Sequence, residues 1–272
     1  MSIQRLKNLV IAALLLINLF FLADILLGRV SDATERSHTI ESLKDVMATS
    51  GIAFSDNAVG DVTVLDAFVT SQDAFAEAVI ARAILGDCEP VQTDSGQMYA
   101  GARGTASFNS RGVFVIDLTE RFEPSGVTIE RAVKKLLKSM SIDTSEPTAT
   151  VFGDTTTVIA QCTWRDSPIF NSTVTFTFSG NELVNVEGLR PSGVSDAPGG
   201  SHISFSTAML SFLRHERAQE TASTVIVSID PGYRLNVGTF GDGSLTPGWL
   251  IVTDTGPYFV DASTGEIMRN DV

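Results

Sequence analysis

The chain has 272 residues, with 19 Lys and Arg against 32 Asp and Glu, so its formal net charge at pH 7 is −13. A surface of that sign repels phosphate backbones and anionic lipid headgroups, which argues against nucleic-acid binding. Beyond an apolar N-terminal segment, about 240 residues remain, enough for one large domain or two modest ones.

The first element in chain order is the apolar run 9–27, which only Asn18 and Asp24 interrupt. A transmembrane helix needs about 20 apolar residues, so this length predicts a single membrane-spanning anchor. Arg5 and Lys7 precede the run, and acidic residues follow it. The positive-inside rule therefore places residues 1–8 in the cytoplasm and the C-terminal part outside it.

A cleaved signal peptide is the competing interpretation of this run, with 31–33 (Ser-Asp-Ala) as the cleavage site. The run is longer than the usual signal-peptide core of about 7–15 residues, which favours a retained anchor. Under both interpretations the bulk of the chain is extracytoplasmic. In the anchored form the protein is located in the cell membrane.

The two polar residues of the predicted span are candidate partner contacts. Asn18 lies near the middle of the bilayer, where an amide is stabilised by hydrogen bonds to another helix. Asp24 lies near the outer boundary, where its carboxylate can reach the interface. The chain has no second apolar span, so a helix that contacts Asn18 must belong to another molecule.

The remaining elements alternate between helices and groups of strands. Helical spacing of apolar residues, or propensity, predicts helices over 39–50, 72–85, 128–140 and 205–218. Strands are expected over 61–69, 104–109, 113–118, 149–152, 156–163, 173–178, 183–186, 224–229, 248–252 and 257–261.

The clearest strand is 173–178 (TVTFTF), in which Val174, Phe176 and Phe178 alternate with threonines. This period of two predicts one buried and one solvated face, with the buried face against a helix. A turn and the segment 183–186 follow, which predicts an antiparallel hairpin.

The order of elements predicts an α+β fold class, in which the transmembrane helix precedes two helix-plus-antiparallel-sheet domains. We expect these extracytoplasmic domains over residues 31–125 and 126–272. A weak similarity between 39–52 and 128–142, each opening with Thr-Ile-Glu, agrees with a repeated unit. The Pro- and Gly-rich segment 190–202 is expected to be a loop.

No catalytic or metal-binding motif is recognisable. His38, His202 and His215 are far apart, and no P-loop, nucleophile elbow or HExxH occurs. We therefore expect no enzymatic activity, no cofactor and no metal. Cys88 and Cys162 permit one disulfide or two free thiols. The segment 171–173 (Asn-Ser-Thr) is a glycosylation sequon that matters only in a eukaryotic secretory host.

The end of the chain reads as a structural hairpin. Tyr258 and Phe259 are strand formers, the segment 263–265 is a turn that ends on Gly265, and Trp249 stands on the preceding strand. Large aromatic residues at strand positions predict packing in the core or on a sheet face.

Both ends of the chain resemble one protein family. The start, LKNLVIAALLLINLFFL, and the end, IDPGYRL…LTPGWLIVTDTGPYFVDASTGEI, are similar to the YycH/YycI family of membrane-anchored two-component-system regulators. The closing hairpin is also similar to PepSY-type modules, which are small α+β units without catalytic residues. The likeness covers the anchor and about the last hundred residues.

The resemblance implies a bitopic regulator of Gram-positive bacteria that acts in signal transduction. Its partners would be a cell-wall sensor histidine kinase, which it restrains through transmembrane-helix and ectodomain contacts, and a sister regulatory protein. Two alternatives remain open: a PepSY-like inhibitor or chaperone of an exported peptidase, and an exported hydrolase with an unrecognised site.

Overall fold

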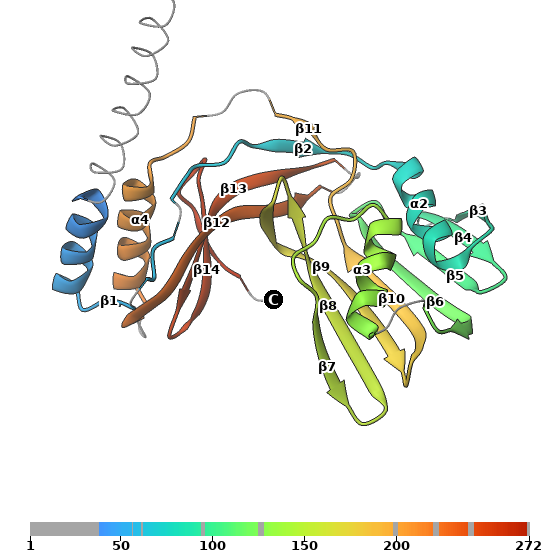
Figure 1. Ribbon diagram of the computed structural model, residues 1–272. Helices are drawn as coiled ribbons and strands as arrows, with labels where there is room; N and C mark the ends of the chain where they lie inside the picture. Colours follow the sequence, from blue (N-terminus) through green and yellow to red (C-terminus); the bar gives the residue numbers. More distant parts are fainter. Residues whose placement is uncertain are drawn as a thin grey trace, which may run out of the picture. The chain divides into compact units, whose positions relative to one another are not determined.

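The structure is a computed structural model (Figure 1), and it describes residues 38–55, 57–60, 62–93, 96–124, 128–197, 201–219, 223–238 and 242–270. The predicted span 9–27, with Asn18 and Asp24, lies outside these residues. Within them, no helix has the length and apolar character that crossing a membrane requires. The chain divides into two compact units, residues 1–54 and 55–272.

The first unit contributes a helix over 38–49 and the short strand β1 (Ala53–Phe54). The helix ends where Gly51 adopts a positive φ of 86°, and the amide of Ile52 donates to the carbonyl of Met47. The Lys44 ammonium lies 5.9 Å from the centre of the Phe54 ring, which ties β1 to the helix.

The second unit contains three consecutive repeats, each a helix followed by four antiparallel strands. The first repeat consists of α2 (Ala74–Leu85), β3 (Cys88–Thr93), β4 (Gly96–Gly101), β5 (Gly104–Phe108) and β6 (Val113–Phe122). The second consists of α3 (Ile129–Ser139), β7 (Thr148–Phe152), β8 (Thr155–Trp164), β9 (Ser167–Ser179) and β10 (Glu182–Leu189). The third consists of α4 (Phe205–Arg217), β12 (Val225–Val237), β13 (Gly243–Thr253), β14 (Gly256–Asp261) and β15 (Ile267–Arg269).

Each repeat helix begins at a residue whose side chain caps the free amides of the first turn. The Asp73 carboxylate accepts from the amides of Phe75 and Ala76, at 3.0 and 3.2 Å. Thr128 and Ser204 serve α3 and α4 in the same way. These caps satisfy donors that have no partner inside the helix, so they fix where each repeat starts.

The first two repeats join through their last strands. β6 and β10 pair antiparallel, which gives an eight-stranded sheet in the order β7-β8-β9-β10-β6-β5-β4-β3. The paired residues include Ile116 and Val186, whose side chains are both fully buried. The division into two domains near residue 125 stays a prediction. β6, which precedes that position, pairs with β10, which follows it.

The third repeat is attached by a short parallel contact between β9 and β12, where Tyr233 pairs with Ile169. The Asn171 side chain extends this contact: its amide nitrogen donates to the Leu235 carbonyl, and its oxygen accepts from the Leu235 amide, both at 2.8 Å. The expected antiparallel sheets therefore form a mixed sheet. A parallel pair is possible here because a long connection that contains α4 separates the two strands. Two short strands, β2 (Phe68–Thr70) and β11 (Ser195–Asp196), extend the third repeat next to β13.

One hydrophobic core lies between the eight-stranded sheet and the helices α2 and α3. Val174, Phe176 and Phe178 are fully buried in it, as the alternation predicts, together with Val133 and Leu137 of α3. The fold class is therefore α+β, with helices on one face of the sheet (Figure 1). The strand expected over 61–69 is wrong for most of its length, because only β2, at Phe68–Thr70, finds a partner strand.

Candidate functional site

The predicted hairpin at the end of the chain is built from β14 and β15, and its aromatic residues are buried. Trp249 is 1% exposed and packs edge-on against Phe205 of α4, with ring centres 5.8 Å apart. Tyr258 packs against Phe212 at 5.6 Å. Phe259 is also buried, so these rings attach α4 to the sheet of the third repeat.

The turn of this hairpin depends on Asp261 and Gly265. The Asp261 carboxylate accepts from the amides of Ser263 and Thr264, and the amide of Gly265 donates to the Asp261 carbonyl. Gly265 has a φ of 74°, in the left-handed region that favours glycine. The hairpin is thus held by its own backbone and by α4.

The face of the eight-stranded sheet opposite the helices is open to solvent. Directly paired residues share a face of an antiparallel sheet, so the register defines rows of side chains across it. One row runs through Thr157, Thr177, Asn185, Asp117 and Thr105. The next runs through Ile159, Thr175, Glu187, Val115 and Ser107. All ten side chains are exposed or half-buried, and we call this surface the open face.

The centre of the open face lies where the two repeats meet. The Asn185 amide donates to the Asp117 carboxylate across the β6–β10 junction, at 3.0 Å. Threonines on both sides, Thr177 and Thr105, offer hydroxyl donors and acceptors, and Ile159 adds an apolar side chain that is 46% exposed. The surface thus combines hydrogen-bonding side chains with an exposed apolar side chain.

A second feature is the Arg190 side chain, which lies at the end of β10 beside α2. Burial lowers the pKa of its guanidinium. Burial also raises the pKa of the Glu77 carboxyl, against a 2.9 Å hydrogen bond that the Gln72 amide donates to it. One nitrogen of Arg190 and one oxygen of Glu77 are buried without a hydrogen-bond partner among the described residues.

Two cavities adjoin Arg190. The one shared with Glu77 has a volume of about 20 Å³, enough for one water molecule. The other, next to Trp164 and Cys162, has about 180 Å³, below the range of about 300–1,000 Å³ that is usual for small-molecule sites. A larger hollow of about 530 Å³ beside the β3–β4 hairpin is lined by Gln72, Pro90, Thr93, Gly96 and Gln97, none of which titrates near neutral pH.

The cysteines are both free thiols. Burial raises the pKa of the Cys162 thiol to about 11, so it is an unreactive core residue at neutral pH. Within the described parts of the chain, no three His, Cys, Asp or Glu side chains gather as metal ligands would. The sequon residue Asn171 uses its side-chain amide to bind Leu235.

Sequence reasoning identified the buried face of 173–178 and the closing hairpin, but not the open face as a unit. The open face depends on the pairing of β6 with β10, between residues about 70 positions apart. The threonine alternation in β9 was the one local signal of it.

The fold and the open face define an α+β protein of repeated helix-plus-four-strand units. No protein-family model matches the chain, and no curated protein does. One similar solved structure is that of an uncharacterized protein from Eubacterium rectale, with 11% identity and a TM-score of 0.49 over 81% of this chain and 90% of that chain. Another is the Bacillus megaterium YpeB C-terminal domain, with 11% identity and a TM-score of 0.35 over 75% of this chain and 100% of that chain. With TM-scores below 0.5, neither likeness assigns an activity to this chain.

Proposed function

We propose that the chain is a non-enzymatic, membrane-anchored regulator whose extracytoplasmic part binds a protein partner through the open face. The apolar run 9–27 is the anchor in this proposal. The similarity of both ends of the chain to the YycH/YycI family supports a sensor histidine kinase and a sister regulatory protein as the partners, with restraint of the kinase as the effect.

The observation that carries the proposal is the open face itself. Eight strands spaced about 4.8 Å apart span about 34 Å, and five or six residues along each strand add about 17–20 Å. The resulting surface of about 600–700 Å² approaches the roughly 800 Å² that each partner contributes to a standard protein interface. A sheet with helices on one face only leaves the other face available for such a contact.

The residues on the open face suit a specific contact. Asp117 and Asn185 form a fixed polar pair at its centre, and the threonines around them lose little side-chain entropy on binding. The exposed side chain of Ile159 gains from burial in an interface. A partner that covers these rows therefore has both polar and apolar groups to bind.

The test is a charge and size change on the open face in the full chain, co-expressed with a candidate sensor histidine kinase of the same organism. We expect Thr175→Arg with Thr177→Arg to reduce co-purification of the kinase and to release its reporter output. Ser201→Arg, at an exposed position outside the repeats, is the matched control and should leave both unchanged. If the open-face variant, at equal protein level, changes neither the co-purification of the kinase nor its reporter output, the open face is not the binding surface.

The anchor has its own test. In the proposal, Asn18 bonds to a helix of the partner, a contact worth about 0.6–2 kcal/mol. Asn18→Leu should therefore weaken membrane co-purification of the kinase while the protein stays in the membrane. Ile17→Leu, an exchange of one apolar residue for another beside Asn18, is the control, and unchanged association with both variants would make the segment a plain anchor.

A further inference from the structure

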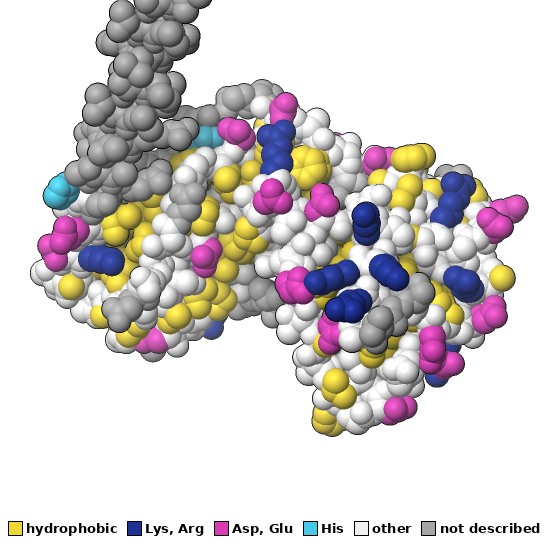
Figure 2. Space-filling model, viewed as in Figure 1, with side chains coloured by type: hydrophobic (Ala, Val, Ile, Leu, Met, Phe, Trp, Pro, Cys, Tyr) yellow, Lys and Arg dark blue, Asp and Glu magenta, His cyan; other side chains and the backbone are white. Residues whose placement is uncertain are grey.

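The solvent-facing side of α3 carries a continuous stripe of positive charge. Arg131, Lys134, Lys135 and Lys138 stand at helical spacings of three and four residues, so they share one side of the helix. All four are exposed, and the opposite side of α3 is buried. Figure 2 shows these dark-blue side chains gathered over α3, on a chain whose net charge is −13. We call these four residues the basic stripe.

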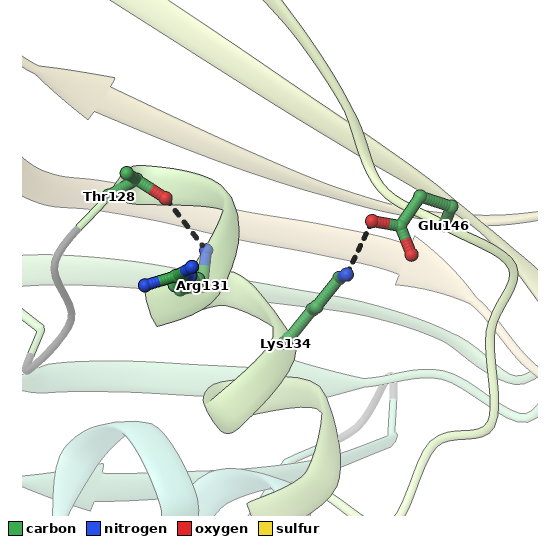
Figure 3. A network of polar contacts seen from close by, with 4 residues as sticks. All are labelled: Thr128, Arg131, Lys134 and Glu146. Atoms are coloured by element: carbon green, nitrogen blue, oxygen red, sulfur yellow. Dashed lines mark hydrogen bonds and ion pairs between the residues drawn. The ribbon is translucent and has the colours of Figure 1, made fainter.

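One member of the basic stripe has a counter-charge close by. In Figure 3 the Lys134 ammonium is directed at the Glu146 carboxylate, and the two form an exposed ion pair. The backbone amide of Arg131 is capped by Thr128, but its guanidinium has no ion-pair partner among the described residues, and the same holds for Lys135 and Lys138. Three positive charges of the stripe are therefore available to another molecule.

Two features of the stripe work against the stability of its own helix, although Lys138 in the last turn suits the helix dipole. Like charges at spacings of three and four residues repel, and Arg131 lies near the N-terminus of α3, where the helix dipole disfavours cations. Solubility does not require this arrangement, since the chain is already strongly acidic. The corresponding helix of the first repeat, α2, has Arg82 as its single basic residue. The helix of the third repeat, α4, carries Arg214, His215 and Arg217 in its last turn, so among the three repeat helices a basic stripe along the whole helix is found on α3.

The geometry points to a binding surface for anionic lipid headgroups: we infer that the basic stripe lies against the membrane that holds the chain. This inference rests on the proposed anchor. Lysine is depleted in specific protein interfaces, whereas three of the four stripe residues are lysines, whose flexible point charges suit a fluid anionic surface. No large hydrophobic side chain of α3 is among the strongly exposed ones of the described chain, so the contact is electrostatic rather than inserted.

The anchor makes a weak electrostatic site effective. Each basic residue near an anionic bilayer contributes a factor of about five to binding. Between Leu27 and His38 a fully extended chain reaches at most about 40 Å, so the bilayer is present at a high effective concentration. Acidic residues elsewhere count less, because the Debye length at physiological salt is about 8 Å.

The experiment uses the full chain in lipid nanodiscs and measures energy transfer from α3 to a headgroup-labelled lipid. The donor dye is attached to the cysteine introduced by Ser139→Cys, at an exposed position next to the stripe. Cys88→Ser removes the partly exposed native thiol, and the remaining native thiol, Cys162, is buried. Discs of phosphatidylcholine alone are compared with discs that also contain phosphatidylglycerol. We expect phosphatidylglycerol to raise the transfer, and about 1 M salt to abolish the rise.

The matched variants separate the stripe from overall charge. Lys135→Glu with Lys138→Glu should remove the rise, whereas Arg111→Glu with Arg214→Glu, which changes the net charge equally at two exposed sites outside α3, should keep it. Circular dichroism verifies that each variant is folded. Equal loss in both variants, or no response to phosphatidylglycerol, would overturn the inference.

Two further outcomes are informative. A stronger response of the dye to polyglutamate than to phosphatidylglycerol would overturn the lipid assignment in favour of an acidic protein. Co-elution of the protein with the nanodiscs tests the anchor separately: failure to co-elute would refute the proposed function, whereas co-elution without a response of α3 would refute the stripe alone.

Discussion

Asn171→Ala removes the one side chain that bonds both backbone groups of Leu235 at the β9–β12 junction. The substitution leaves the amide and the carbonyl of Leu235 without partners, next to a side chain that is 4% exposed. Each unsatisfied buried polar group costs about 1–3 kcal/mol, so we expect the loss of both to cost about 2–6 kcal/mol. For a unit of this size that lowers Tm by about 4–24 °C.

The assay is thermal unfolding of the full chain in detergent, followed by near-ultraviolet circular dichroism. Asn185→Ala is the matched control, because Asn185 makes one hydrogen bond, to Asp117, on the open face. Its loss should cost about 1 kcal/mol or less. A decrease in Tm for Asn171→Ala no larger than that for Asn185→Ala would refute the reasoning that this amide joins the second and third repeats.

Three other perturbations test the core and the closing hairpin. Trp249→Ala should destabilise the protein by about 3–5 kcal/mol, because the ring is fully buried against α4, whereas Phe152→Ala, at a ring that is 88% exposed, should leave the denaturant midpoint unchanged. Gly265→Ala should cost about 1 kcal/mol or more in the same denaturation, because its φ of 74° strains any residue with a Cβ atom, and a gain in stability would contradict that assignment. Cys162 should resist alkylation in the folded protein below pH 9, as followed by mass spectrometry. Because its folded pKa is raised to about 11, the unfolded state loses the thiol proton first, and stability should decrease as the pH rises from about 9 towards 11.

Local periodicity was sufficient to predict an element from the sequence where that element has one buried side and one solvated side. The threonine–aromatic alternation of β9 and the apolar stripes of α3 and α4 predicted both the elements and the buried residues. β3 and β4 were missed, since Cys88–Thr93 contains a proline and Gly96–Gly101 begins and ends on glycine. Their strand conformation depends on the pairing of β3 with β4 and of β4 with β5, which no local pattern encodes.

The repeats were only partly visible in the sequence for a related reason. The similarity between 39–52 and 128–142 connects the helix 38–49 with α3, whereas the structure groups α3 with α2 and α4. The three repeat helices differ in composition, since α2 is rich in alanine, α3 in lysine, and α4 in aromatic and polar residues. Shared topology, rather than shared residues, defines the repeat. The open face could not be predicted, because it arises from pairings between distant strands.

The junction of the first two repeats through β6 and β10 has a consequence for self-association. It leaves the first strand of each repeat, β3 and β7, at the two outer edges of the eight-stranded sheet. β3 contains Glu89 and Pro90, a charge and a missing amide donor that discourage another strand from adding. β7 reads Thr-Ala-Thr-Val-Phe, without either safeguard, and Phe152 at its end is largely exposed. At high concentration, chains of this protein should therefore add to one another along β7, while the β3 edge stays closed to growth.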